Sequence, residues 1–191
     1  MMLLSSFLLT ACGYHTGVEE ETLSVPYFNG DTNGALTDTV IKVLAASGDF
    51  RYTDRKGNLL LKGTIISDTN ENIGYQFDRD PVSGQRIHRL VPNEGRREIT
   101  VEITLTDSRT QKVIYGPVRV SAHGDYDFVD SDSLRDTSFI NTAGTRESSL
   151  FFSMGQLDSI DGAKATSLDP IHRSLALKIV EGISNLPYNA E

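Results

Sequence analysis

The chain has 191 residues, which suits one domain with room for a long insertion. Hydrophobic residues make up 38% of it and charged residues 23%, so it can build a sizeable core and is not a disordered chain. The 26 acidic residues outnumber the 18 basic ones, and the net charge of −8 argues against general nucleic-acid binding, which needs a basic face, although it leaves room for a local basic patch. The single cysteine excludes an intrachain disulfide and a cysteine-based zinc cluster. No apolar run reaches the roughly 18 residues of a transmembrane helix.

The N-terminus has the layout of a lipoprotein signal sequence. Residues 1–11 are a short apolar run ending in small residues, and Leu9-Thr10-Ala11-Cys12 matches the bacterial lipobox. We therefore expect 1–11 to be a signal peptide and Cys12 to be acylated, palmitate included, at the head of a polar tether over 12–21. The run is too short for a stable helix, which disfavours the alternative of a buried structural cysteine. Acyl chains on Cys12 would anchor the protein to a membrane.

Two details of this region refine the expectation. No Lys or Arg precedes Lys42, although signal peptides begin with basic residues, so we expect a basic stretch upstream of Met1. Gly13, rather than aspartate, follows the cysteine, which favours the outer membrane over retention at the inner membrane.

The first elements of the domain are a strand and a helix. Residues 22–27 alternate between polar and apolar, which predicts a half-buried strand that Pro26 either ends or confines to a sheet edge. Residues 34–47 predict an amphipathic helix that ends at Gly48. The side chains predicted to face the core are Leu23, Val25 and Tyr27 of the strand and Leu36, Val40, Val43 and Leu44 of the helix.

The middle of the chain is rich in β pattern. Residues 58–77 predict one long strand, or a strand with a break, before an exposed loop around 80–84. The clearest alternation lies over 97–106, with one apolar and one polar face. A short turn joins it to a partner strand over 113–122, with a bulge at Gly116-Pro117. The two form a predicted antiparallel hairpin.

The last part of the chain combines a long insertion and a helix. Residues 125–166 are too many for a plain connection, and we interpret them as holding a short helix near 146–157 or a mobile stretch. The final helix begins near residue 168, with Asp169 as its cap and Pro170 in its first turn. Its apolar stripe is Leu168, Ile171, Leu175, Ile179, Ile183 and Leu186.

Taken together, the elements predict a single α+β domain over 22–188. The order is β-α-β-β-β-α, with two helices packed on one face of a four-stranded mixed, largely antiparallel sheet. This arrangement is the simplest way to bury both apolar helix stripes.

A search for catalytic and metal-binding patterns finds none. Nucleophile, Walker and dinucleotide-binding motifs are absent from the sequence, so we expect no enzyme activity, no cofactor and no metal. The histidines form no close pair, and each is interpreted as a surface residue: His15, His88, His123 and His172. The acidic stretch that loosely suggests calcium lacks the glycine and glutamate of an EF-hand, so a solvated loop is preferred; it comprises Asp125, Asp127, Asp130, Asp132 and Asp136. Asp78 and Asp80 are interpreted in the same way.

One basic segment stands out against the acidic chain. Residues 86–97 carry four arginines against the single acid Glu94, and we expect them to project from a loop or from one end of the sheet. Guanidinium groups bind phosphate in a bidentate manner, so a phosphorylated glycolipid head group is a candidate ligand. The alternatives are a solubilising loop and a contact with an acidic partner. The candidate residues are Arg86, Arg89, Arg96 and Arg97.

The segment Leu9–His15, with its Cys-Gly-Tyr-His opening, resembles the start of the mature lipopolysaccharide-assembly lipoproteins of the LptE family. The resemblance continues in the strand Ser24–Asn29, in the first helix, in the 97–122 hairpin and in the last helix. It covers about three quarters of the chain and is specific only around Cys12. The acidic balance and the long 125–166 segment depart from the family pattern; the segment could be an added contact with the wall of a partner barrel.

The resemblance implies a fold of two helices on a four-stranded sheet. It also implies a lipoprotein on the periplasmic face of the outer membrane that plugs a large β-barrel of the LptD type. There it would assist assembly of the barrel and help deliver lipopolysaccharide to the outer leaflet, with the 86–97 arginines as the plausible contact. Two alternatives remain open: an outer-membrane lipoprotein that activates or scaffolds a periplasmic cell-wall enzyme, and a lipid-anchored hydrolase.

Overall fold

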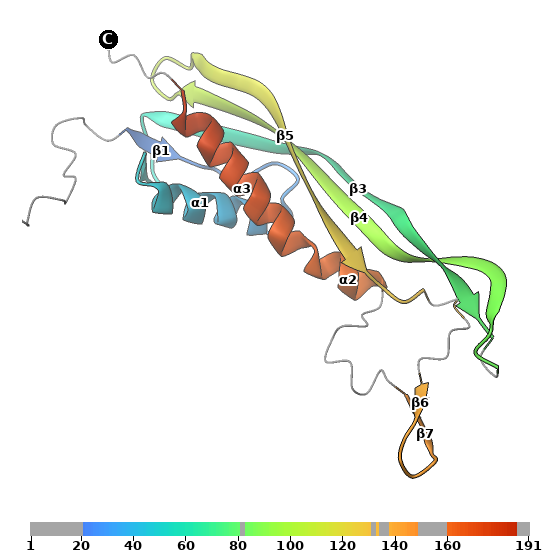
Figure 1. The fold of residues 1–191 in the computed structure, drawn as a ribbon. Coiled ribbons are helices and arrows are strands. Elements are labelled where there is room, and N and C mark those ends of the chain that lie inside the picture. Colours follow the sequence, from blue (N-terminus) through green and yellow to red (C-terminus); the bar gives the residue numbers. More distant parts are fainter. Residues whose placement is uncertain (1–20, 81–82, 131–132, 134–137, 149–159, 187–191) are drawn as a thin grey trace, which may run out of the picture.

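The computed structural model describes residues 21–80, 83–130, 133, 138–148 and 160–186, and the structural statements that follow concern these residues (Figure 1). Cys12, the signal peptide and all but the end of the tether lie outside them. The elements are β1 (Thr22–Ser24), α1 (Ala35–Ser47), β2 (Arg51–Tyr52), β3 (Leu59–Arg79), β4 (Arg86–Asp107), β5 (Val113–Asp127), β6 (Ser138–Ile140), β7 (Arg146–Ser148), α2 (Ile160–Thr166) and α3 (Leu168–Ser184).

The main sheet has five strands in the order β2-β1-β3-β4-β5, one more than predicted. β1 is parallel to both β2 and β3, whereas β3, β4 and β5 form an antiparallel meander. The additional strand, β2, has two residues, too few to show a period in the sequence. Two backbone hydrogen bonds hold it, from Arg51 N–H to the carbonyl of Glu21 and from Thr53 N–H to the carbonyl of Leu23.

Strands β3 and β4 form a long arm that runs past the helices (Figure 1). β3 is continuous over 21 residues, so the alternative of a broken strand is wrong. It pairs with β4 from Leu59 opposite Asp107 to Arg79 opposite Arg86, with register shifts that include one between Ile65 and Ser67. Such bulges increase the local twist without ending the pairing.

One face of the sheet carries both long helices, as predicted (Figure 1). The alternation in β4 places Ile99, Val101 and Ile103 in the core, each at most 2% exposed. α1 ends at Gly48, whose φ of 76° is the left-handed conformation that glycine adopts most easily. The fully buried residues contributed by the two helices are Leu36, Val40, Leu44, Ile171, Leu175, Ala176, Ile179 and Ile183.

Tyr27 departs from the predicted alternation and is 78% exposed. β1 ends at Ser24, so the period-two pattern does not continue to Tyr27. Phe28 fills the core position instead, at 2% exposure, and packs against Gly63 of β3, where a Cβ would overlap its ring.

Two further expectations can be compared with the structure. The bulge at Gly116-Pro117 is confirmed. Ile103 pairs with Val118 and Leu105 pairs with Tyr115, so the single residue Thr104 lies opposite two residues, Gly116 and Pro117. The peptide bond between Gly116 and Pro117 is cis. The N-cap position of α3 is held by Ser167, and Asp169 lies within the first turn. The prediction of Asp169 as the cap is wrong, because α2 runs almost directly into α3.

The 125–166 insertion contains extended structure at the start of the predicted helix near 146–157, and its short helix, α2, lies later, over Ile160–Thr166. β5 continues to Asp127, and β6 and β7 form a separate two-stranded sheet. β7 occupies the first residues of the helix predicted near 146–157, and the rest of that prediction lies outside the described residues. Within the described part of the chain, no helix is long and apolar enough to cross a membrane.

Candidate functional site

The four candidate arginines lie within β4 rather than in a loop; Arg86 and Arg89 are near one end of the sheet, as predicted, whereas Arg96 and Arg97 lie well inside the strand. The apolar alternation that marks a strand is weak over 86–97, because β4 there belongs to the protruding arm and has little core to face. Arg86 and Arg97 are eleven residues apart, about 36 Å along an extended strand. The arginines therefore form two separate groups rather than one patch.

Arg96 lies on the helix-free face of the sheet and is directly opposite Asp125 of β5. Its guanidinium donates two hydrogen bonds to the carboxylate, from Nε to Oδ1 at 2.7 Å and from Nη2 to Oδ2 at 2.8 Å. The hydrogen bond with Arg96 holds the pKa of Asp125 below its usual value, and the same contact raises the pKa of Arg96. This charge is already paired within the domain.

Arg97, on the helix-covered face, is paired in the same manner with Asp68 of β3. Its Nε and Nη2 donate to the two carboxylate oxygens at 2.8 and 2.6 Å, and its Nη1 donates to the backbone carbonyl of Lys164 in α2. The hydrogen bond to Asp68 raises the pKa of Arg97. Arg97 thus links β3, β4 and α2, which is a structural role.

Near the tip of the arm, Arg89 faces a buried carboxylate. Its Nη1 is 3.9 Å from Oδ2 of Asp78, which is 1% exposed. Asp78 also accepts a hydrogen bond from the hydroxyl of Ser133 at 2.9 Å. The interpretation of Asp78 as a solvated loop residue is therefore wrong: it lies in β3, and Ser133 from the insertion contributes to its cover.

Arg86 is the remaining member, and it lies over an aromatic ring rather than beside an acid. Its guanidinium carbon is 3.8 Å from the ring centroid of Phe77, a cation–π geometry. Phe77 is 40% exposed, and its neighbours Tyr75 and Leu90 are each 58% exposed. Among the residues that the structure describes, Arg86 is the candidate arginine without an ion pair, and it belongs to an apolar, cationic surface on the arm.

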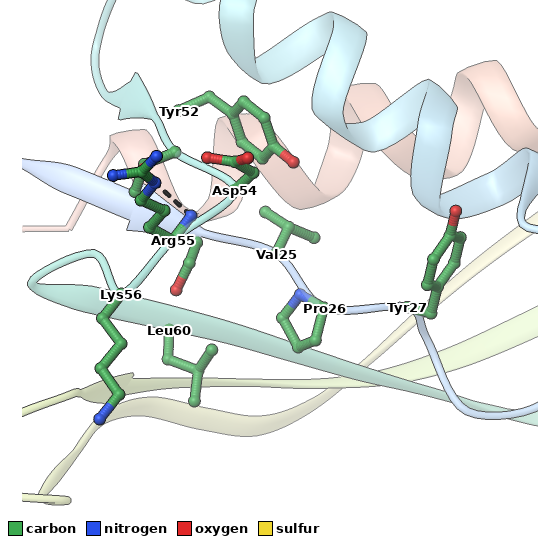
Figure 2. Close-up of a pocket in the computed structure, with 10 residues that line it drawn as sticks. Val25, Pro26, Tyr27, Tyr52, Asp54, Arg55, Lys56 and Leu60 are labelled. Atoms are coloured by element: carbon green, nitrogen blue, oxygen red, sulfur yellow. Dashed lines mark hydrogen bonds between the residues drawn. The ribbon is translucent and has the colours of Figure 1, made fainter.

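A second candidate site lies at the edge of the sheet where β2 ends (Figure 2). This edge pocket has a volume of about 580 Å³, within the range of small-molecule sites. Figure 2 shows Arg55 and Lys56 at one end, Tyr27 at the other, and apolar side chains between them. The lining residues are Ser24, Val25, Pro26, Tyr27, Tyr52, Thr53, Asp54, Arg55, Lys56 and Leu60.

The sequence analysis missed the edge pocket because its walls come from three separate segments. Arg55 and Lys56 follow β2, Pro26 and Tyr27 follow β1, and Leu60 lies in β3. The available signal was Pro26, which indicated that the strand ends there and leaves an incomplete edge.

Among the residues that the structure describes, the other predicted histidines and aspartates form no common site. His172 is 6% exposed, so its prediction as a surface residue is wrong, and burial lowers the pKa of its imidazole. His88 and His123 are exposed, as predicted, and His15 lies outside the described residues. Asp125 and Asp127 lie in β5 rather than in a loop, whereas Asp132 and Asp136 are not described. Within the described ranges, no three metal-ligating side chains form a group.

Comparisons with known proteins give structural similarities only. No family model matches the chain, and no curated protein matches it. A minor lipoprotein from Acinetobacter baumannii is 15% identical, with 88% of this chain and 93% of that chain covered and a TM-score of 0.45. An uncharacterized lipoprotein B from Nitrosomonas europaea is 10% identical over 86% and 83%, with a TM-score of 0.48. The rare lipoprotein B from Shewanella oneidensis is 13% identical over 86% and 94%, with a TM-score of 0.42. At these values the similarities assign neither a family nor a function.

Proposed function

We propose that this protein is a non-enzymatic outer-membrane lipoprotein, anchored through Cys12 on the periplasmic side, that plugs a large LptD-type β-barrel. In that position it assists assembly of the barrel and helps deliver lipopolysaccharide to the outer leaflet. The observation that carries the proposal is the Leu9–His15 segment, followed by a domain with two helices on one face of a mixed sheet. The LptE resemblance implies the same two helices on one face of a sheet, with four strands in place of the five observed.

The helix-free face of the sheet supports the proposal because it is polar where β4 pairs with β5. Three cross-strand pairs between β4 and β5 line it: Glu98 with His123, Thr100 with Ser121, and Glu102 with Arg119. The hydroxyls of Thr100 and Ser121 are 2.8 Å apart, and Arg119 forms an ion pair with Glu102 at 3.4 Å. The interior wall of an outer-membrane barrel is also polar, so this face suits the lumen better than lipid.

The length of β4 supports the proposal too. β4 has 22 residues, which corresponds to about 70 Å of extended strand. The apolar band of an outer-membrane barrel is about 25 Å tall. An element of this length is long enough to cross the whole lumen, as a plug that spans the barrel would require.

A pull-down in mild detergent tests the proposal. The tagged, full-length protein is purified and its co-purifying proteins are identified by mass spectrometry, with an unrelated tagged outer-membrane lipoprotein as the control. We expect one large outer-membrane barrel in a stoichiometric amount. Recovery of a periplasmic cell-wall enzyme in its place would favour the activator alternative, and recovery of the protein alone would refute the plug.

A further inference from the structure

The edge pocket holds two cations that the fold leaves unpaired. Arg55 and Lys56 are exposed, and within the described residues neither forms an ion pair. In contrast, the exposed side chains of Arg96 and Arg119 are both paired with acids. In a chain of net charge −8, adjacent unpaired cations at the mouth of a pocket are available to an anion from outside.

The loop that carries these cations is held against the sheet. Asn58 N–H donates to the hydroxyl of Thr22 at 2.9 Å, and Arg55 N–H donates to the hydroxyl of Thr53 at 3.2 Å. Gly57 is buried so closely against β1 that a Cβ would lie 2.7 Å from the carbonyl oxygen of Thr22. The backbone beneath Arg55 and Lys56 is therefore positioned before any ligand arrives, which reduces the entropy cost of binding.

The rest of the edge pocket is apolar and ends in an aromatic ring. Val25 is 7% exposed and forms part of the floor with Pro26 and the half-buried Leu60. Tyr27 is 78% exposed, and its ring lies over Gly34 at the start of α1, where a Cβ would be only 2.7 Å from Cε1. The core does not need Tyr27, because Phe28 fills the core position. Its exposed face is thus available for stacking with a ligand.

The charged residues that line the pocket favour an anion with a single negative charge. Asp54 lines the same pocket and contributes one negative charge against the two positive charges of Arg55 and Lys56. The net charge of +1 is balanced by a monoanion, whereas a phosphate dianion would leave the rim negative. A carboxylate also fits the planar fork of the arginine guanidinium.

We infer that the edge pocket binds an organic carboxylate with an apolar body, its charge at the end of the pocket that carries Arg55 and Lys56 and its apolar group along Val25, Pro26 and Tyr27 (Figure 2). The carboxyl terminus of a peptide with an apolar last residue and a free acyl acid both offer this chemistry. The site is separate from the arginines of β4, so it stands independently of the proposed barrel and lipopolysaccharide contacts.

Paired probes that differ only in charge test this inference. The full-length protein, labelled with ¹⁵N in mild detergent, is titrated with N-acetylphenylalanine and with its uncharged amide, and amide-group shifts are followed by NMR. We expect the acid to bind at least about tenfold more tightly than the amide, since one charge-assisted contact is lost, with the largest shifts at Val25, Tyr27 and Arg55. Hexanoate in a parallel titration separates the two sources: tighter binding of hexanoate indicates an acyl acid, and tighter binding of N-acetylphenylalanine indicates a peptide terminus.

Two double variants with the same change of charge provide the control. Arg55→Gln with Lys56→Gln should remove the preference for the acid, whereas Lys42→Gln with Arg173→Gln, two exposed changes on the helices, should retain it. Tyr27→Ala should weaken the binding of the acid and of the amide equally, because it removes a stacking contact and leaves the charges unchanged. Any of four results would overturn the inference: equal binding of the acid and the amide, chemical-shift changes confined to other residues, absence of binding, or loss of the preference for the acid in the helix control.

Discussion

At the scale of single residues, His172 is a buried, titratable side chain in the core. It lies in α3 at 6% exposure, and its Nδ1 has no hydrogen-bond partner within the described part of the chain. Burial is the main cause of its lowered pKa. The charged groups that act on it are Asp31, Asp169 and Asp68, which favour the protonated form, and Arg97, which opposes it.

The lowered pKa of His172 predicts a pH-dependent stability. The unfolded imidazole, with a pKa near 6.5, binds its proton before the folded one does, so the free energy of unfolding decreases as pH falls from about 7 to 5. We expect His172→Leu, which keeps the volume and removes the titrating group, to flatten this part of the pH profile. Chemical denaturation at several pH values measures it, with the exposed His123→Gln as the control. An unchanged slope in His172→Leu would contradict the assignment.

At the scale of elements, β4 shows how strand geometry separates neighbouring charges. Successive side chains in a strand point to opposite faces, so Arg96 and Arg97 meet acids on different sides of the sheet. Arg86 lies on the arm and contacts Phe77 rather than an acid. A segment that is basic along the sequence is therefore largely neutralised in space by β3 and β5.

This separation predicts unequal roles for the arginines in binding lipopolysaccharide. Arg86→Gln should weaken binding while the thermal midpoint stays near that of the unmodified protein, because Arg86 has no ion pair within the described residues. Arg96→Gln, the matched control, should leave binding nearly unchanged, because its charge already satisfies Asp125. Neutralising all four arginines should weaken binding at least as much as Arg86→Gln does. Binding to lipopolysaccharide and thermal unfolding are measured in parallel, and equal losses from the two single changes would contradict this division.

At the scale of the whole molecule, the proposed function combines an anchor in the N-terminal segment with a folded domain. The domain has a core on one face of the sheet and a polar, helix-free face on the other, and its arm extends beyond the helices (Figure 1). In this proposal the anchor would hold the protein at a membrane, and the sheet faces and the arm would determine what it contacts there. The two functions can be separated experimentally.

Replacement of the proposed lipid-bearing residue tests the anchor. Cys12→Ala should abolish labelling of the protein with radioactive palmitate and yield a soluble, unlipidated periplasmic form, because no other cysteine is present to accept the diacylglyceryl group. Ser6→Ala, within the same apolar run, should label normally. Continued labelling of Cys12→Ala would refute the lipobox assignment.

The sequence by itself determined the α+β class, the two long helices and the β4–β5 hairpin, because each depends on local periodicity and on turn or capping residues near it. The tertiary structure alone decided which charges are paired, since the register of β3, β4 and β5 places Asp68 and Asp125 beside arginines 29 residues away. It also decided the burial of Asp78 and His172 and the position of Tyr27. The edge pocket could not be predicted, because it exists only where β2 ends beside β1 and β3. Local pattern is encoded within a few residues, whereas partners and pockets depend on how distant segments pack.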